Sequence, residues 1–432
     1  MGRHHLRVLT ACMVVAVGAP AGAAEVTQVL TAAEPNKPFS LDFSVRWDRT
    51  QKRVRITREA ANPPTADSPN GSIEEQTALR YTRVTNAIVP RLAIGVYQDL
   101  ELHAELPYVL NDDTTWGAGT SHGFASTVVQ DNVLNPDGGY CDPTNHTPCP
   151  IFPVPNTVYH GGRASDLKLG FAWAVFNDRK DDTKPTWVVG LDVTAPTAQL
   201  YDPVAGRDLG ATGQPWLSPY SVAANPGPVG EKIWRFDVYT ALSKRMGPFD
   251  PYVKAHVVGM QRTPSTFSNC DHAAAMAARV PAEAASWAAA ACAADPSQGN
   301  ASLPYVAGLV AGAELVPYQD VAQGQKVSID IRLTADYTSR ARWYNELTEA
   351  TGKLLQTESY LSVGALFGLY LRASDNVALD ATASLATDTS HFLTGETPGT
   401  ASYDARLDAP GSRFRSTEAS IFTVSVAGIV RF

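Results

Sequence analysis

Past its first 24 residues, the 432-residue sequence has no uninterrupted apolar stretch of the roughly 20 residues that a membrane-spanning helix requires. A membrane protein built from helices is therefore excluded. Charge of one sign is lacking as well, because the formal net charge is −8 and acidic and basic residues are mixed along the chain. This balance argues against a nucleic-acid partner.

Cysteine is scarce, with five residues in the chain, one of them at position 12. The others form two local pairs, Cys141/Cys149 and Cys270/Cys292, in segments that we predict to be loops. An even number of closely spaced cysteines suits disulfides formed in an oxidising compartment. We therefore predict two disulfides, each closing one loop.

The start of the chain has the features of a secretory signal peptide. Arg3 and Arg7 precede an apolar run over residues 8–17, and small residues follow at 21–24. We expect cleavage near Glu25. The expected parts of the chain are a signal peptide over 1–24, an N-terminal periplasmic segment over 25–37 and an outer-membrane β-barrel over 38–432.

A lipoprotein signal is the alternative interpretation of the same segment. Leu9-Thr10-Ala11-Cys12 resembles a lipoprotein cleavage box, with Cys12 as the lipid-bearing residue. Only a few apolar residues precede Cys12, and most of the apolar run follows it. Cleavage near Glu25 is therefore favoured.

Strict two-residue alternation is the main signal after the signal peptide. Large apolar residues alternate with small or charged ones over 167–175, 187–194 and 328–337, near the 9 to 11 residues that a tilted transmembrane strand needs. A soluble barrel would turn the apolar face inward, whereas a membrane barrel turns it outward. Alternation alone does not choose between the two.

The connections favour a membrane barrel, because short and long ones alternate. Turns at 245–248 and 373–375 are short. The long polar connections are 111–162, 198–231, 262–303, 340–355 and 390–417. Short turns at one rim and long extracellular loops at the other are typical of outer-membrane barrels.

These connections predict an all-β, antiparallel up-and-down barrel of about 12 strands. The expected strands are 38–59, 74–96, 99–110, 163–176, 185–197, 232–244, 249–261, 304–316, 325–339, 356–372, 376–389 and 418–432. In the first strand the apolar phase changes between Trp47 and Val54. We predict a bulge near residues 49–52; a separate hairpin would give an odd strand number.

The last strand ends on Phe432, with Phe422, Val424, Val426 and Val430 on the same face. A terminal aromatic on an alternating strand resembles the signal that the outer-membrane assembly machinery recognises, so this machinery and outer-membrane lipid are expected partners. With a periplasmic C-terminus, every long loop lies outside the cell.

Two segments resemble an outer-membrane family associated with the meta-pathway of phenol degradation. One is the turn and strand over 92–102 that closes on Leu106-Pro107-Tyr108; the other is Asp166-Leu167-Lys168-Leu169-Gly170 followed by the strand over 188–197. Where that family tends to have glycine after Pro-Thr, this chain has Ala198. The resemblance implies a barrel that transports small, often aromatic, compounds.

Strand phase predicts which ionisable side chains face the lumen, since Arg or Lys on the lipid face costs about 2 to 4 kcal/mol at mid-membrane. The predicted lumen set is Glu101, His103, Glu105, Lys168, Asp192, Arg235, Asp237, Lys254, His256, Asp330, Arg332, Asp336, Arg372 and Asp380. These residues either form a salt-bridged plug or a polar constriction that orders solutes by charge and size. The sequence leaves both alternatives open.

Metal, cofactor and enzyme chemistry are not expected. His103 and His256 are alone on their strands, without the spacing of a metal motif. Ser121-His122 and Ser390-His391 are adjacent pairs in predicted loops. The alanine-rich segment 271–295 is interpreted as a passive surface loop, with a helical lid as the alternative. Residues 135–149 resemble calcium turns but lack EF-hand spacing.

The sequence therefore predicts a monomeric or oligomeric pore for passive uptake of small molecules. The alternative class is a non-transport structural or adhesin-like barrel whose loops bind a partner. Small lumen-facing residues such as Gly170, Ala172, Gly364 and Gly368 favour an open pore; closure by charged pairs would favour the alternative.

Overall fold

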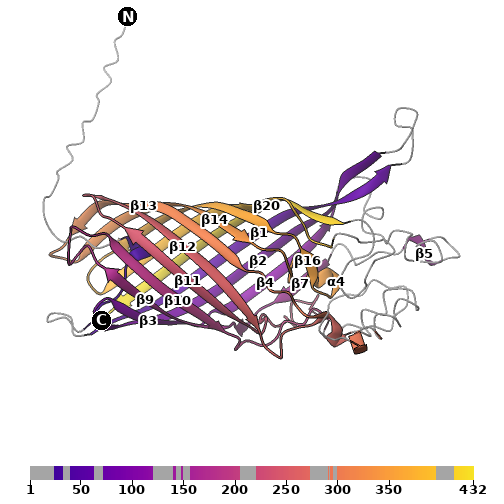
Figure 1. Ribbon diagram of the computed structural model, residues 1–432, viewed down its shortest axis with the longest axis horizontal. Helices are drawn as coiled ribbons and strands as arrows, with labels where there is room; N and C mark the ends of the chain where they lie inside the picture. Colours follow the sequence, from indigo (N-terminus) through magenta and orange to yellow (C-terminus); the bar gives the residue numbers. More distant parts are fainter. Residues whose placement is uncertain are drawn as a thin grey trace, which may run out of the picture.

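The protein is a single elongated barrel in the computed structural model (Figure 1). The structure describes residues 24–32, 39–62, 72–119, 140–142, 147–148, 156–204, 220–272, 290, 292–294, 299–395 and 413–432.

Twelve antiparallel strands cross the barrel, as predicted. They are β1 (Ser40–Asn62), β2 (Ser72–Tyr97), β3 (Leu100–Glu105) continued by β4 (Tyr108–Ala118), β7 (Asn156–His160) and β8 (Arg163–Ala164) continued by β9 (Leu167–Phe176), β10 (Thr186–Ala195), β11 (Ile233–Ser243), β12 (Phe249–Arg262), β13 (Val306–Asp320), β14 (Gln325–Thr338), β17 (Tyr360–Arg372), β18 (Val377–Asp388) and β20 (Phe414–Arg431). Each pairs with its neighbours along the chain, and β1 pairs with both β2 and β20. The barrel is therefore closed and satisfies its own backbone hydrogen bonds.

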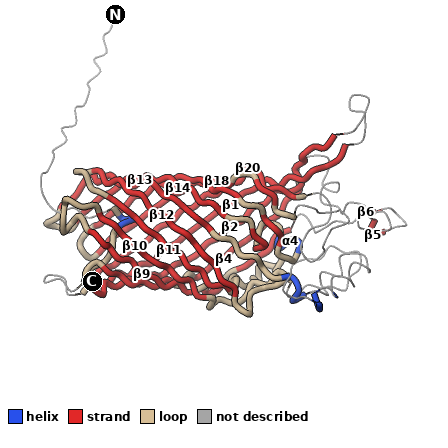
Figure 2. Tube along the Cα trace, in the orientation of Figure 1, coloured by secondary structure: helices blue, strands red, loops and turns tan. Residues whose placement is uncertain are grey.

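Several short elements do not cross the barrel. They are η1 (Glu25–Thr27), β5 (Tyr140–Asp142), β6 (Thr147–Pro148), η3 (Asn269–His272), β15 (Ala341–Trp343), α4 (Thr348–Thr351), β16 (Leu355–Thr357) and β19 (His391–Phe392). We call the end with the short turns and Phe432 the turn end, and the end with α4 and the long connections the loop end (Figures 1 and 2). Among the described residues, no helix is long and apolar enough to cross a membrane.

The third and fourth strands are longer than predicted. Residues 111–118 continue β4, and β7 already begins at Asn156, within a segment that we expected to be a loop over 111–162. The prediction was wrong there because these residues, such as Asp112 and Thr114, lie beyond the apolar part of the wall. Without a lipid-facing side, a strand loses the alternation by which it can be recognised. Residues 414–417, expected to be loop, likewise belong to β20.

The predicted bulge at residues 49–52 is also wrong. The pairing of β1 with β2 is regular from Ser40 to Ile56, and the pairing with β20 shifts only between Arg53 and Arg55. Phe43, Val45 and Trp47 point outward, whereas Val54 and Ile56 point inward and are buried. The backbone phase is therefore nearly constant, and the apolar side changes because the surroundings of the strand change.

An apolar belt covers the outside of the barrel. Its exposed side chains include Phe43, Trp47, Leu92, Leu169, Phe171, Trp173, Ile331, Leu333, Phe367, Leu385 and Phe422. Leu333 and Ile331 on β14 are 63% and 62% exposed, whereas Asp330 on the same strand is 1% exposed. Apolar residues outside and ionisable ones inside are the arrangement of a membrane barrel. The protein is thus an integral outer-membrane β-barrel.

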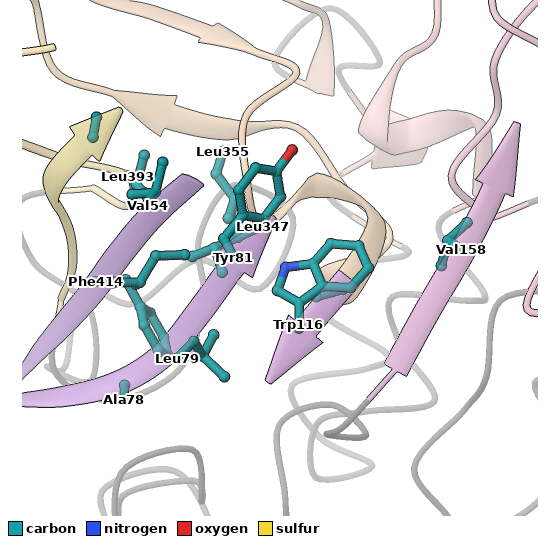
Figure 3. Packing of buried hydrophobic residues seen from close by; sticks show 13 residues of the cluster. Val54, Ala78, Leu79, Tyr81, Trp116, Val158, Leu347, Leu355, Leu393 and Phe414 are labelled. Atoms are coloured by element: carbon teal, nitrogen blue, oxygen red, sulfur yellow. The ribbon is translucent and has the colours of Figure 1, made fainter. Parts of the chain in front are cut away.

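A hydrophobic core fills the loop end of the barrel (Figure 3). Val54, Ile56, Leu79 and Trp116 from the wall pack with loop residues, among them Leu347, Leu355 and Leu393. The Nε1–H of Trp116 also donates to the carbonyl oxygen of Glu346, at 2.9 Å. These contacts hold the segment 341–357 in place across the mouth of the barrel.

One of the two predicted disulfides is present. The Sγ atoms of Cys270 and Cys292 are 1.98 Å apart. Residues 290 and 292–294 are helical, while residues 273–289, 291 and 295 of the segment predicted to be a passive surface loop lie outside the described residues. Cys149 also lies outside them, so its pairing with Cys141 stays a prediction.

Candidate functional site

Two larger cavities lie inside the described part of the barrel. The central chamber has a volume of about 590 Å³ and is lined by inward-facing side chains of the wall and by Glu25, Gln28 and Leu30. The vestibule, of about 240 Å³, lies at the loop end between the wall and the segments that cross the mouth.

Eight of the predicted lumen residues line the central chamber. They are Glu101, His103, Glu105, Lys168, Asp192, Lys254, Arg332 and Asp380. The remaining six are Arg235, Asp237, His256, Asp330, Asp336 and Arg372, whose surroundings are described below. Their role in solute passage remains a prediction.

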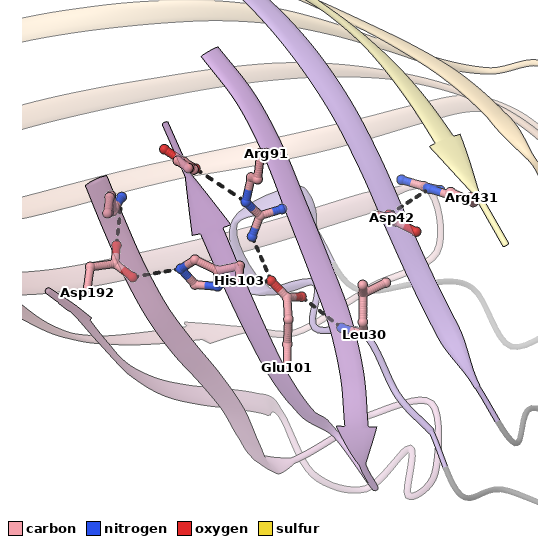
Figure 4. A network of polar contacts seen from close by, with 9 residues as sticks. Leu30, Asp42, Arg91, Glu101, His103, Asp192 and Arg431 are labelled. Carbon is pink, nitrogen blue, oxygen red and sulfur yellow. Dashed lines mark hydrogen bonds and ion pairs between the residues drawn. The ribbon is translucent and has the colours of Figure 1, made fainter. Parts of the chain in front are cut away.

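One network joins strands β2, β3, β9 and β10 (Figure 4). Asp192 accepts from Lys168 at 2.8 Å and lies 2.8 Å from the Nε2 of His103. Arg91 donates to Glu101 at 2.6 Å and lies 3.3 Å from Glu105. Neighbouring strands thus neutralise one another's charges across the chamber wall.

A second network lies on β12, β14 and β17. The Asp330 carboxylate accepts the Tyr252 hydroxyl at 2.5 Å, the Tyr370 hydroxyl at 3.2 Å and the Arg332 guanidinium. Because these donors satisfy the carboxylate, Asp330 can remain buried.

Two more of the predicted groups are paired, His256 and Arg235. The imidazole of His256 lies 3.4 Å from Asp237 and 2.9 Å from Asp336, and Arg235 binds Glu231. Arg372 and Asp380 line a small pocket beside Glu25. Among the described residues no cluster of three or more His, Cys, Asp or Glu could hold a metal ion.

Side chains of neighbouring strands cover the small residues that were named as favouring an open pore. A Cβ on Gly170 would lie 2.2 Å from the Oδ1 of Asp192 and 2.4 Å from the Nε2 of His103, and a Cβ on Gly368 would lie 3.0 Å from the Tyr370 hydroxyl. Ala172 is only 6% exposed and packs in a small cluster at the turn end. The side chains of adjacent strands lie across these positions and fill the space that the small residues leave.

The N-terminal segment 24–32 lies inside the turn end of the barrel rather than beyond it (Figure 2). The Glu25 N–H donates to Glu314 at 2.8 Å and the Leu30 N–H donates to Glu101 at 3.0 Å. The Ala32 N–H donates to the carbonyl oxygen of Tyr97 at 3.3 Å. The segment thus narrows the lumen at this end. Its sequence is not strand-like, so alternation could not place it.

The vestibule is lined by charged and polar side chains and by six aromatic ones: Tyr81, Trp116, Tyr201, Trp343, Tyr344 and Tyr360. The rings of Tyr201 and Tyr344 stack with centroids 4.9 Å apart, and Trp343 meets Tyr344 edge-on at 5.0 Å. The hydroxyl of Tyr344 donates to the carbonyl oxygen of Tyr201 at 2.7 Å. The ring faces are therefore held in place before any solute enters.

The charged groups of the vestibule are paired. The ammonium of Lys52 lies 2.8 Å from Glu346 and 3.0 Å from Asp388, and Arg83 donates to Asp112 at 2.6 Å. Burial raises the pKa of the Glu346 carboxyl, but the nearby Lys52 ammonium outweighs it and lowers the pKa below its ordinary value. Sequence reasoning missed this site, although the Trp343-Tyr344 pair in a predicted loop was an available signal.

Of the two serine-histidine pairs, only Ser390-His391 lies within the described residues. His391 stacks on Tyr360 with centroids 4.2 Å apart, and its Nδ1 lies 2.8 Å from the carbonyl oxygen of Thr389. Ser121 belongs to a Gly-x-Ser-x-Gly pattern over 119–123 that sequence reasoning overlooked. That pattern is catalytic at a strand-to-helix turn, and residues 120–123 lie outside the described residues.

No protein-family model matches the chain, and no curated protein matches it in sequence. Among solved structures, an outer membrane channel from Pseudomonas putida F1 aligns over 90% of this chain and 95% of its own, at 11% identity and a TM-score of 0.39. A FadL homologue from Pseudomonas aeruginosa and the TodX monoaromatic hydrocarbon channel (deltaS2 mutant) each align over 91% of this chain and 90% of their own, at 10% identity and a TM-score of 0.34. The barrel architecture rests on this chain's own strand pairing, and membership of the phenol-pathway family stays a prediction.

Proposed function

We propose that this barrel is an outer-membrane channel for passive uptake of small molecules, and that aromatic or otherwise hydrophobic compounds are its preferred solutes. The observation that carries the proposal is the aromatic vestibule at the loop end, next to a polar chamber inside the same barrel. A solute arriving from outside meets the ring faces first.

The vestibule suits a ring-shaped solute of low charge. Aromatic pairs contribute about 0.5 to 1.5 kcal/mol beyond the area that they bury. Tyr201, Trp343 and Tyr344 pack on one another at the wall of the cavity, so a solute ring would extend an existing aromatic stack. Because Lys52 and Arg83 are already bound to carboxylates, an anionic solute would find no free cation at either of them.

The chamber supports passage of neutral solutes. Seven acidic side chains (Glu25, Asp42, Asp48, Glu101, Glu105, Asp192 and Asp380) and six basic ones (Arg46, Arg91, Lys168, Lys254, Arg332 and Arg431) line it. Since neither sign dominates, the chamber wall sets up no strong barrier against an uncharged molecule.

A non-transport, surface-binding barrel is the second candidate. The ion-paired lumen and the N-terminal segment inside the turn end favour it, because both narrow the interior. The two functions differ in where a small solute binds: a channel binds it in the vestibule, whereas an adhesin-like barrel has no need of a small-molecule site.

We expect the folded barrel to bind benzyl alcohol more tightly than cyclohexylmethanol, its saturated counterpart, in a calorimetric titration. Tyr344→Leu should weaken benzyl alcohol binding roughly 2- to 10-fold, since one aromatic contact is lost. Tyr344→Phe, which keeps the ring, should bind nearly as wild type.

Tyr305→Leu is the matched control, because Tyr305 is 52% exposed on the outside of the barrel and contacts Tyr337. It should leave binding unchanged. Equal binding of the two alcohols, or equal losses in Tyr344→Leu and Tyr305→Leu, would remove the aromatic vestibule as the solute site.

A further inference from the structure

Four arginines point outward from the barrel near its loop end. Arg49, Arg53 and Arg55 lie on β1 and Arg80 lies on β2, and all four are exposed. They share the outward phase of Phe43, Val45 and Trp47 on β1 and of Ile88 and Leu92 on β2, which belong to the apolar belt. The same outer face thus changes from apolar to basic along these two strands.

The change is complete where the belt ends, since Arg49 still pairs with Val424 and donates to Asn86. Gln51 on β1 pairs with Phe422 on β20, whose side chain is 47% exposed and lipid-facing. Arg53 is the next outward residue after Gln51, about 7 Å farther along the strand at ~3.3 Å per residue. Its guanidinium is therefore placed beside the outer edge of the belt, where lipid headgroups meet the protein. The long loops mark this edge as the cell-surface side.

The charges at this edge are not balanced by the protein. Arg55 pairs directly with Arg80 across the two strands, and like charges in such positions destabilise a sheet. Arg55 also binds Glu418, whereas among the described residues neither Arg53 nor Arg80 makes an ion pair. Three guanidiniums with one carboxylate leave a net charge of +2 on the patch that we define as Arg53, Arg55 and Arg80.

We propose that this patch binds the phosphorylated headgroup of an anionic lipid in the outer leaflet. A guanidinium can donate two parallel hydrogen bonds to one phosphate, and a phosphate between Arg55 and Arg80 relieves their repulsion. The acyl chains of the same lipid lie along Trp47, Ile88 and Phe422. A free phosphate would gain the guanidiniums alone, so the adjoining belt favours a lipid.

Glu418 neutralises only one of the facing guanidiniums, so the repulsion between Arg55 and Arg80 is relieved in part within the protein. Gly117, opposite Arg80 on β4, leaves room beside the patch: a Cβ there would lie 3.8 Å from the backbone oxygen of Arg80. The headgroup therefore has access from the side of β4 as well as from lipid.

The test is native mass spectrometry of the folded, full-length barrel in detergent, titrated with diphosphorylated lipid A and with its dephosphorylated form. The wild-type barrel should bind the phosphorylated lipid on the order of tenfold more tightly or better. Arg53→Gln/Arg80→Gln should lose most of that preference. The matched control Arg179→Gln/Lys184→Gln, which removes two exposed positive charges at the turn end, should keep it.

Equal binding of the two lipids by the wild-type barrel would overturn the proposal, and this comparison needs no variant to fold. Equal losses in the two double variants would overturn it too. If inorganic phosphate or heparin, at the same concentration as the lipid, displaced the lipid from the barrel, the patch would be a site for a free anion or a soluble polyanion. The lipid proposal would then be wrong. None of these outcomes depends on solute passage through the lumen.

Discussion

Replacing Leu333 by arginine should impair insertion of the barrel, whereas replacing its neighbour Thr334 by arginine should not. Leu333 is 63% exposed within the apolar belt, so a charged side chain there would cost about 2 to 4 kcal/mol if it lies near the midplane. Thr334 points inward, and its Oγ1 lies 3.0 Å from the position of a Cβ on Gly364. Heat-modifiable mobility on gels measures the folded fraction of each variant.

Thr334→Arg should also shift the ion selectivity of the pore toward anions, because it adds a positive charge to the lumen wall. The two substitutions introduce the same side chain at adjacent positions, one on the outer and one on the inner face of β14. Normal folding of Leu333→Arg together with failure of Thr334→Arg would reverse the lumen and lipid faces of β14.

The second large effect should come from Gly95→Ala, which we expect to raise the conductance of the barrel severalfold. A Cβ at Gly95 would lie 2.8 Å from the carbonyl carbon and oxygen of Thr31, in the N-terminal segment. Because backbone atoms cannot turn aside as a side chain can, the segment must move and the turn end of the lumen should widen.

Gly259→Ala is the control for this effect, since a Cβ there would meet nothing within 4 Å. Single-channel recordings in planar bilayers compare the two. A conductance of Gly95→Ala equal to that of Gly259→Ala and wild type would show that the segment 24–32 does not limit flow.

The strands of the barrel wall could be predicted because each residue's environment, lipid or lumen, follows from its position along the strand. Along β14, each of Ile329, Ile331 and Leu333 faces outward and each of Asp330 and Arg332 faces inward, as the two-residue alternation requires. Lipid outside and a polar lumen inside impose the same rule on every residue of the span. The number of strands followed from repeating that rule.

The rule fails where the surroundings change. Val54 and Ile56 are apolar on the inward side because they pack under the loops, not because the backbone shifts. The sequence pattern is the same whether an apolar residue faces lipid or packs inside a covered lumen. The sequence therefore shows a change after Trp47, but it does not distinguish a shift of the backbone phase from a change in the surroundings of the strand.

The site was predictable only in part. Strand phase gave the direction of His256, but its contacts with Asp237 and Asp336 depend on the register of three strands. The vestibule brings Tyr201 and Tyr344 together from loops 143 residues apart in the chain, as their hydrogen bond shows. Contacts over such a separation are fixed by the closed barrel, and no local pattern encodes them.

The central claim is that the barrel conducts small solutes through its lumen, and planar-bilayer recording tests it most directly. Insertion of the wild-type barrel should give discrete conductance steps that shrink when benzyl alcohol is added on the loop side, because the solute occupies the aromatic vestibule. The claim would be contradicted if the folded, inserted barrel gave no conductance above that of the lipid bilayer alone, both for the wild-type protein and for Gly95→Ala.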